Sequence, residues 1–414
     1  MKQNIQTGIM GALALFAVYL YYLSASPLPS HASTPTLLKI KTMPLLNIND
    51  EEINALQYLN ELRQGAGLIP FTSQTQLHEA AQNHANYLTN HLTYGHKENH
   101  QHKDFTGEYA SSRIRYVGYS SPQVIENVSA HNFSYKESID GLFSAIYHRF
   151  AFLDFRSDSM GIGISQHALK RTQTAFVYDM SSKGLEKLYK SKTTVTSKKL
   201  ERVLNKSKKL NSKVVTYPYN AQKDIPPAFF DELPDPLPQH RVSGFPVSVS
   251  FNSAYYKEIK LIKFQLFNNE GIEIKDNITF DHKSDPHQRL TAFDFVLFPL
   301  KRLDWNQEYH VVFVAEVDNK IMEKRWSFQT KKFSMPLNIV TKENAQYSMK
   351  ENESNIFYFP PHSKVDLLGD VAYPAGVDIS FIDKNTIKLT ALKTTVTPIE
   401  LNIGGHFFKV SITN

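Results

Sequence analysis

The sequence predicts an α+β domain followed by two all-β domains. Residues 48–184 contain helix-period apolar patterns and two short apolar runs. From residue 241 onward, short apolar runs are separated by Asn, Gly, Asp and Pro. At 414 residues the chain is longer than a single core requires, so two or three domains are expected. We place the domains at 48–184, 241–332 and 334–414, with a linker over 185–240.

The composition is that of a globular protein, with 41% hydrophobic and 21% charged residues. The chain has no cysteine, which excludes disulfides, thiolate metal ligands and cysteine nucleophiles. Small secreted eukaryotic domains usually carry disulfides, so the absence of cysteine favours a bacterial envelope protein.

Residues 1–34 are predicted to be a signal peptide or an N-terminal membrane anchor with a spacer. Lys2 precedes an uncharged, mostly apolar run over residues 8–23, and small residues follow it. The run is long for a signal-peptide core and shorter than the ~20 residues that span a bilayer comfortably. We therefore expect export to the periplasm or the cell exterior. Cleavage remains open, the alternative being an inner-membrane anchor formed by residues 8–23.

The basic charge is local. Residues 183–213 hold ten Lys and one Arg against two Glu, a net charge of +9, so the rest of the chain sums to −3 of the total +6. This distribution does not predict a nucleic-acid-binding face. A solvated surface is the simpler interpretation of these lysines, and attraction to an anionic lipid or cell-wall polymer is the functional alternative.

Three helices are predicted in the α+β domain. The first begins near Asn49 and ends before Gly65, and its expected apolar face is Ile53, Leu56, Leu59 and Leu62. The second spans about 74–92, with Leu77, Ala81, Ala85, Leu88 and Leu92 on one side. The third begins at a Ser134–Glu137 capping box and continues to about residue 149. The two strands are expected at 160–165 and 174–178.

The remaining chain is predicted to begin with a linker, in which 185–213 forms a solvated helix or loop and 216–238 an extended, Pro-rich connector. Five apolar runs then predict a β-sandwich containing Trp305 and Trp326 as core aromatics, at residues 245–251, 259–267, 293–298, 309–317 and 325–330. Shorter runs predict a second, small β domain, at 356–359, 377–382, 386–392, 400–403 and 406–412.

The residues that could carry chemistry lie between positions 84 and 163. In chain order they are His84, Tyr94-Gly95-His96, Lys97-Glu98-Asn99-His100-Gln101-His102, Phe105-Thr106-Gly107, Arg113, Arg115, Gly118-Tyr119, Ile125-Glu126-Asn127, Tyr147-His148-Arg149 and Met160-Gly161-Ile162-Gly163. This order resembles the bacterial CAP (SCP/PR-1-like) domain. In that family an aromatic-small-His is followed by Gly, Arg-x-x-x-Gly-Tyr, Gly-Glu-Asn, a helix, His-Arg and a Gly-x-Gly strand.

The resemblance covers about a third of the chain and implies an α-β-α sandwich. It also implies that His96, Glu126 and His148 meet in a binding cleft on one face, ahead of an Ig-like β domain. Two imidazoles and a carboxylate could hold a loose Zn²⁺ site with water in the open positions. They could equally form a carboxylate-oriented imidazole, which is the arrangement that a general base needs.

The sequence also departs from the family pattern. Ile125 replaces the Gly before Glu126, Leu142 stands where many members have Trp, and Ala151 replaces Asn. Residues 145–147 replace Ser-Pro-Gly. No acid can be placed as the second glutamate of a four-residue cleft, and Glu108 and Glu137 are spare candidates.

Each candidate has a structural alternative. His96 could be a hydrogen-bonded loop residue, Glu126 could pair with Arg113 or Arg115, and a helix C-terminus could favour His148. We interpret His84 as core-facing or hydrogen-bonded. We interpret His100 and His102 as surface residues, and Tyr147 and Arg149 as packing and salt-bridge residues.

Two classes of function follow. The first is a non-enzymatic module in the cell envelope or outside the cell that binds a lipid, a glycan or a protein. The second is a metal-assisted or His/Glu-dependent hydrolase acting on peptide or ester bonds. The sequence contains no Gly-x-Ser-x-Gly elbow and no His-Glu-x-x-His helix, which favours the binding module.

Overall fold

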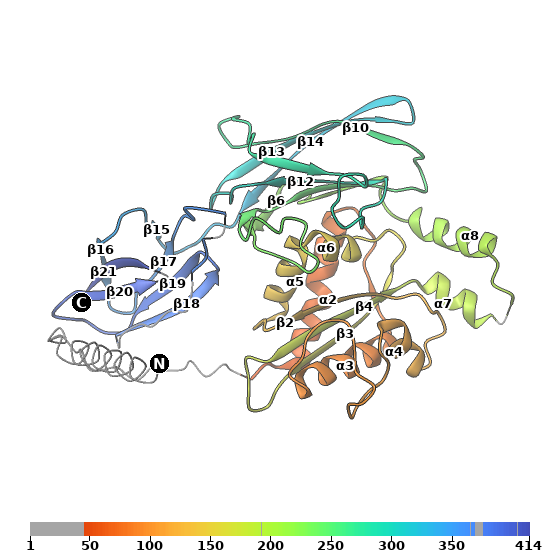
Figure 1. The fold of residues 1–414 in the computed structure, drawn as a ribbon, viewed down its shortest axis with the longest axis horizontal. Helices are drawn as coiled ribbons and strands as arrows, with labels where there is room; N and C mark the ends of the chain where they lie inside the picture. Colours follow the sequence, from red (N-terminus) through yellow and green to blue (C-terminus); the bar gives the residue numbers. More distant parts are fainter. Residues whose placement is uncertain (1–44, 192, 365, 369–375, 404) are drawn as a thin grey trace, which may run out of the picture.

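The computed structural model describes residues 45–414 except 192, 365, 369–375 and 404. Three bodies follow one another along the chain: an N-terminal α/β region, a middle β-sandwich and a C-terminal β-sandwich (Figure 1). A pair of helices, α7 (Lys183–Lys190) and α8 (Ser197–Lys208), projects from the side between the first two bodies (Figure 1). The predicted signal or anchor segment over 8–23 lies outside the described residues. None of the described helices is long and apolar enough to cross a membrane.

The N-terminal region has a four-stranded sheet with strand order β1-β3-β4-β2. Its strands are β1 (Thr72–Ser73), β2 (Ile125–Ala130), β3 (Ser159–Gln166) and β4 (Thr174–Ser181). Helices α3 (Thr75–Asn90) and α4 (Ala110–Tyr116) cover one face of the sheet. The other face packs against α2 (Ile48–Gly65), α5 (Tyr135–Ser144) and α6 (Ile146–Phe152). The region is therefore the expected α-β-α sandwich.

Two glycines allow α3 to lie directly on β3. A Cβ atom on Gly161 would come within 2.0 Å of the Leu77 carbonyl carbon, and one on Gly163 within 2.2 Å of the Ala81 carbonyl carbon. No side chain fits at those distances, so the Gly-x-Gly of this strand is a packing requirement. Ile162 and Ile164, which alternate with the glycines, point into the core on the opposite face.

The predicted helices differ from the observed ones in three details. Ile53 is 59% exposed, and Ala55 takes its place in the buried face with Leu59 and Leu62. The second helix ends at Asn90, which leaves Leu92 43% exposed. The third helix is broken at Ala145, whose ψ of 113° leaves the helical region, so the expected single helix is the pair α5 and α6.

The middle sandwich consists of two four-stranded sheets with strand orders β10-β13-β14-β6 and β11-β12-β9-β5. All five predicted strands are present, and β11 (Asn277–Phe280) was not predicted. The five are β9 (Val247–Phe251), β10 (Ile259–Phe267), β12 (Asp294–Pro299), β13 (Glu308–Val317) and β14 (Lys320–Thr330). Both tryptophans are buried.

The stretch expected as a connector also contributes to this sandwich, which corrects the prediction of an extended linker. Strand β5 (Val214–Tyr217) pairs antiparallel with β9, and β6 (Gln222–Ile225) pairs parallel with β14. Strand β7 (Ala228–Phe229) pairs with β8 (Ser243–Gly244). The nearby prolines lie outside the paired residues of β5 and β6, so they do not interrupt pairing as they would inside a central strand.

The C-terminal sandwich has a four-stranded sheet, β15-β17-β19-β18, and a three-stranded sheet, β16-β21-β20. Its strands are β15 (Leu337–Ile339), β16 (Ala345–Lys350), β17 (Ser354–Tyr358), β18 (Val377–Asp383), β19 (Thr386–Ala391), β20 (Ile399–Ile403) and β21 (His406–Thr413). A separate hydrophobic cluster fills it. Arg302 connects it to the middle sandwich through an ion pair with Asp383.

The N-terminal region and the middle sandwich share one continuous core. Phe143 of α5 lies 4.7 Å from Tyr217 of β5, measured between ring centroids. Arg149 of α6 is fully buried and donates to the Pro246 carbonyl and the Ser248 hydroxyl. It forms no salt bridge among the described residues, contrary to one of its two predicted roles; burial lowers its pKa to about 9. The two bodies are packed together rather than tethered.

Candidate functional site

The predicted residues His96 and Glu126 contact each other. His96 follows α3 in a loop, and Glu126 is the second residue of β2. The His96 Nδ1 atom lies 2.9 Å from Glu126 Oε1, and the second carboxylate oxygen of Glu126 accepts from the Arg113 guanidinium. The His96 side chain is 49% exposed, whereas that of Glu126 is only 4% exposed. A buried, ion-paired carboxylate therefore orients a half-exposed imidazole.

This carboxylate is anionic in the structure. Burial would raise the pKa of Glu126, but the hydrogen bond with His96 and the charge of Arg113 outweigh burial and hold the pKa below its ordinary value. Glu126 thus contacts His96 through one oxygen and forms, through the other, the ion pair with Arg113 that was its structural alternative. Arg115 is exposed and is not the partner.

A second buried pair supports the first. His84 and Glu98 are both fully buried, with His84 Nδ1 3.0 Å from Glu98 Oε1 and His84 Nε2 3.0 Å from the Gly95 carbonyl. Glu98 also accepts from the Thr106 and Gly107 amides. These bonds hold the segment between α3 and α4, which carries His96 and leads to Arg113. His84 is thus a hydrogen-bonded core residue, as the sequence indicated.

A third buried acid, Asp179, was not among the residues predicted for the site. It lies directly opposite Glu126 in the β2–β4 pairing and is fully buried. Among the described residues, no donor reaches either of its carboxyl oxygens. Burial and the negative charge of Glu126 raise the pKa of Asp179 well above its ordinary value, so Asp179 holds its proton more tightly than an exposed aspartate does.

The third predicted residue, His148, lies near the other two but has a different carboxylate partner. Its ring is nearly parallel to that of His96, with centroids 6.5 Å apart and planes 15° apart. Its Nδ1 atom lies 3.1 Å from Glu232 Oε2. His148 is the third residue of α6, not the end of a long helix, so a C-terminal dipole does not account for it.

Glu232, the partner of His148, lies outside the residues expected to form the cleft. It lies on the β7–β8 connection of the middle sandwich, and its side chain is 1% exposed. It accepts from the backbone N–H groups of Ile146 and Tyr147 as well as contacting His148. Burial raises its pKa, and the hydrogen bond with His148 partly offsets this. No sequence signal could have found it, because its position depends on the packing of two bodies.

The other candidates have structural roles. Glu108 pairs with Lys97 at the surface, and Glu137 accepts from the Phe133 amide at the start of α5. His100 is exposed, while the Nδ1 atom of His102 lies 2.8 Å from the hydroxyl of Tyr87.

The zinc site expected from the sequence stays a prediction. Within the described residues, no group of three or more His, Asp or Glu side chains is placed to hold a metal ion. His96, Glu126 and His148 lie together, but both oxygens of Glu126 are engaged by His96 and Arg113. His148 contacts Glu232 instead. The carboxylates contact the Nδ1 atoms of His96 and His148, which does not engage Nε2, so these contacts do not exclude a metal-ligand role and the zinc assignment stays a prediction.

The N-terminal region matches the family model of the cysteine-rich secretory protein family, CAP, over residues 56–180. These residues form a CAP domain. None of the curated proteins matches the chain significantly.

Solved structures of bacterial origin resemble this part of the chain. An outer surface protein of Borrelia burgdorferi is 15% identical with a TM-score of 0.30, covering 34% of this chain and 98% of that one. An extracellular SCP-domain protein of Bacillus anthracis is 15% identical with a TM-score of 0.29, covering 34% of this chain and 45% of that one. A cysteine-rich secretory protein of Staphylococcus aureus is 17% identical with a TM-score of 0.24, covering 33% and 40%. The matched region therefore spans less than half of the last two proteins.

The departures of this CAP domain from the family pattern coincide with its contacts to the middle sandwich. Ile146, within the replaced Ser-Pro-Gly, is fully buried in a cluster with Phe229 and Phe298. The Tyr147 hydroxyl donates to Asp285. Ile125 lines a cavity between the two bodies. These substitutions therefore adapt the domain to its neighbour.

Proposed function

We propose that the chain is exported and acts in the periplasm or at the cell surface as a non-enzymatic binding protein for a lipid or a cell-wall component. The observation that carries the proposal is that a buried carboxylate holds each of the two histidines of the polar cluster. His96 and His148 each use Nδ1 to contact a carboxylate, and within the described residues neither ring contacts a hydroxyl nucleophile.

The binding assignment is tested with the full chain and three probes: purified peptidoglycan sacculi, phosphatidylglycerol vesicles and palmitate. We expect at least one to bind saturably, and binding to survive the combined His96→Ala and His148→Ala substitutions. If none of the three is bound, the proposed function is wrong.

Export is tested separately by adding protease to intact spheroplasts that express the full chain. Residues beyond the N-terminal segment should be digested without lysis. Protection until the membrane is lysed would contradict export.

One observation favours the alternative of a hydrolase. His96 is half-exposed, is oriented by an anionic carboxylate and has an Nε2 atom without a partner among the described residues, which suits a general base acting on water. A panel of peptide and ester substrates decides between the two. If the wild type shows turnover that Glu126→Gln abolishes, the hydrolase alternative replaces the binding proposal. We expect no turnover from the wild type or from the variant.

A further inference from the structure

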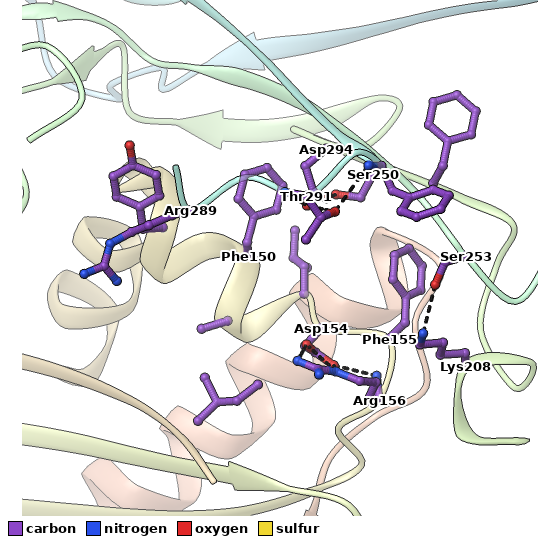
Figure 2. A pocket seen from close by; sticks show the side chains of 16 residues that line it. Phe150, Asp154, Phe155, Arg156, Lys208, Ser250, Ser253, Arg289, Thr291 and Asp294 are labelled. Atoms are coloured by element: carbon purple, nitrogen blue, oxygen red, sulfur yellow. Dashed lines mark hydrogen bonds and ion pairs between the residues drawn. The ribbon is translucent and has the colours of Figure 1, made fainter. Parts of the chain in front are cut away.

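A cavity of about 610 Å³ lies where the CAP domain, the end of α8 and the middle sandwich meet (Figure 2). This volume falls within the range of about 300–1,000 Å³ typical of small-molecule sites. The cavity is separate from the cluster of His96, Glu126 and His148, none of which lines it. Two different bodies form its walls, so it exists only because they are packed together.

Aromatic side chains from both bodies provide the apolar part of the lining. Phe150 and Phe155 come from α6 and the loop after it, while Phe251 and Phe293 come from β9 and the segment before β12. Phe150, Phe155 and Phe293 remain only half-buried. Half-buried phenyl rings on both sides of one cavity suit the hydrocarbon part of a ligand.

The charged side chains of the lining differ in whether they already have a partner of opposite charge. Arg156 and Asp154 neutralise each other through a bidentate ion pair, and Asp294 accepts from Ser250 and Thr291. Within the part of the chain that the structure describes, Lys208 donates only to the Ser253 hydroxyl. The Arg289 guanidinium lies 5.7 Å from the centre of the Tyr147 ring.

Within the described residues, neither Lys208 nor Arg289 forms an ion pair with a carboxylate. In the view of Figure 2 they lie on opposite sides of the cavity, with Phe150 and Phe155 between them. Burial and the nearby Arg156 lower the pKa of Lys208, so an anion beside it would relieve an unfavourable environment.

This lining discriminates between ligand classes. Two cations without a carboxylate partner among the described residues disfavour a cationic ligand, and the four phenyl rings favour a ligand with an apolar body over a wholly polar one. A lipid bilayer is too large to enter a recess between two packed bodies. A single chain that carries one anionic group and an apolar body satisfies both parts of the lining.

We propose that this cavity binds a single-chain anionic amphiphile of the long-chain carboxylate type, with the carboxylate at Lys208 or Arg289 and the chain against the phenyl rings. The inference rests on the proposed binding function and assigns the ligand to a site outside the polar cluster of the CAP domain.

The test measures palmitate binding to the full chain and to the double variant Lys208→Gln/Arg289→Gln. We expect binding to weaken about tenfold or more, since a charge-assisted contact is lost. The matched control is Lys206→Gln/Lys283→Gln, which removes two exposed lysines from α8 and the loop before β12. The control should bind as the wild type does. Hexadecanol, with the same chain and no charge, should bind more weakly than palmitate.

A photoreactive palmitate analogue provides a second measurement that does not depend on a variant. Its adducts should fall on residues 150–156 and 289–294. Equal binding by the double variant and the wild type, equal binding of hexadecanol and palmitate, or adducts confined to other segments would each overturn the site. If sacculi or vesicles bind and palmitate does not, this inference fails while the proposed function stands. If phosphatidylglycerol vesicles compete for the cavity and palmitate does not, the ligand is a phospholipid and the carboxylate assignment is wrong.

Discussion

Replacing Glu232 with Ala should destabilise the protein strongly, because one carboxylate there joins two bodies. Its loss leaves the Ile146 and Tyr147 amides and the His148 ring without their acceptor. A buried polar group left unsatisfied costs about 1–3 kcal/mol, and neighbouring losses are not additive, so we expect a total of about 3–5 kcal/mol. Glu232→Gln keeps an amide oxygen as acceptor and should cost only about 1–2 kcal/mol.

The assay is urea unfolding of the full chain, followed by tryptophan fluorescence and far-ultraviolet circular dichroism. Both tryptophans lie in the middle sandwich, so fluorescence reports on that body, while circular dichroism also reports on the CAP helices. We expect both transitions to shift together. The control is Asp231→Ala, which removes only a surface pair with Lys384 and should cost less than about 1 kcal/mol. A loss below about 1 kcal/mol for Glu232→Ala, or a shift equal to that of the control, would refute the reasoning.

Because the pKa of Asp179 is raised in the folded protein, its contribution to stability is present below its unfolded pKa and is lost as pH rises through its folded pKa. Asp179→Asn should therefore remove this loss, so that the variant becomes more stable relative to the wild type as pH rises. A variant whose stability falls with rising pH as the wild type's does would contradict this. Glu126 has a lowered pKa, so its contribution is present above the unfolded pKa and is lost on acidification, and Glu126→Gln should flatten the acid limb of the stability curve. Arg302→Ala should cost about 2–4 kcal/mol and speed proteolysis between the two sandwiches, because Asp383 loses its partner; unchanged proteolysis would argue against Arg302 as the connection. A chelator should leave Tm unchanged, and a fall that zinc reverses would support the metal hypothesis.

The fold of the CAP domain could be predicted because its signals are local. The apolar period of α3, the Ser134 cap and the Gly-x-Gly of β3 each depend on a few neighbouring residues. The strands β5 and β6 were missed because short runs next to prolines resemble a connector until their partner strands are known. Leu92 and Ile53 were misplaced because the period of a helix does not say which of its residues meet another element.

The candidate site, too, was predictable only where its signals lie in the sequence motifs. The order of motifs brought His96 and Glu126 into one proposal, and the structure places them 2.9 Å apart. From the sequence alone, Ile125, Ile146 and Tyr147 were only departures from the family pattern. In the structure they are contacts with the second body.

The sequence by itself determined the CAP domain, the two β domains that follow it and two of the residues that contact Glu126, His96 and Arg113. Those features depend on periodicity, turn chemistry and motif order, which are written in contiguous residues. Only the tertiary structure decided that Glu232 contacts His148, that Asp179 lies opposite Glu126, and that a cavity opens between the two bodies. These pairings join residues far apart in the chain, and they exist only once the CAP domain and the middle sandwich share one core.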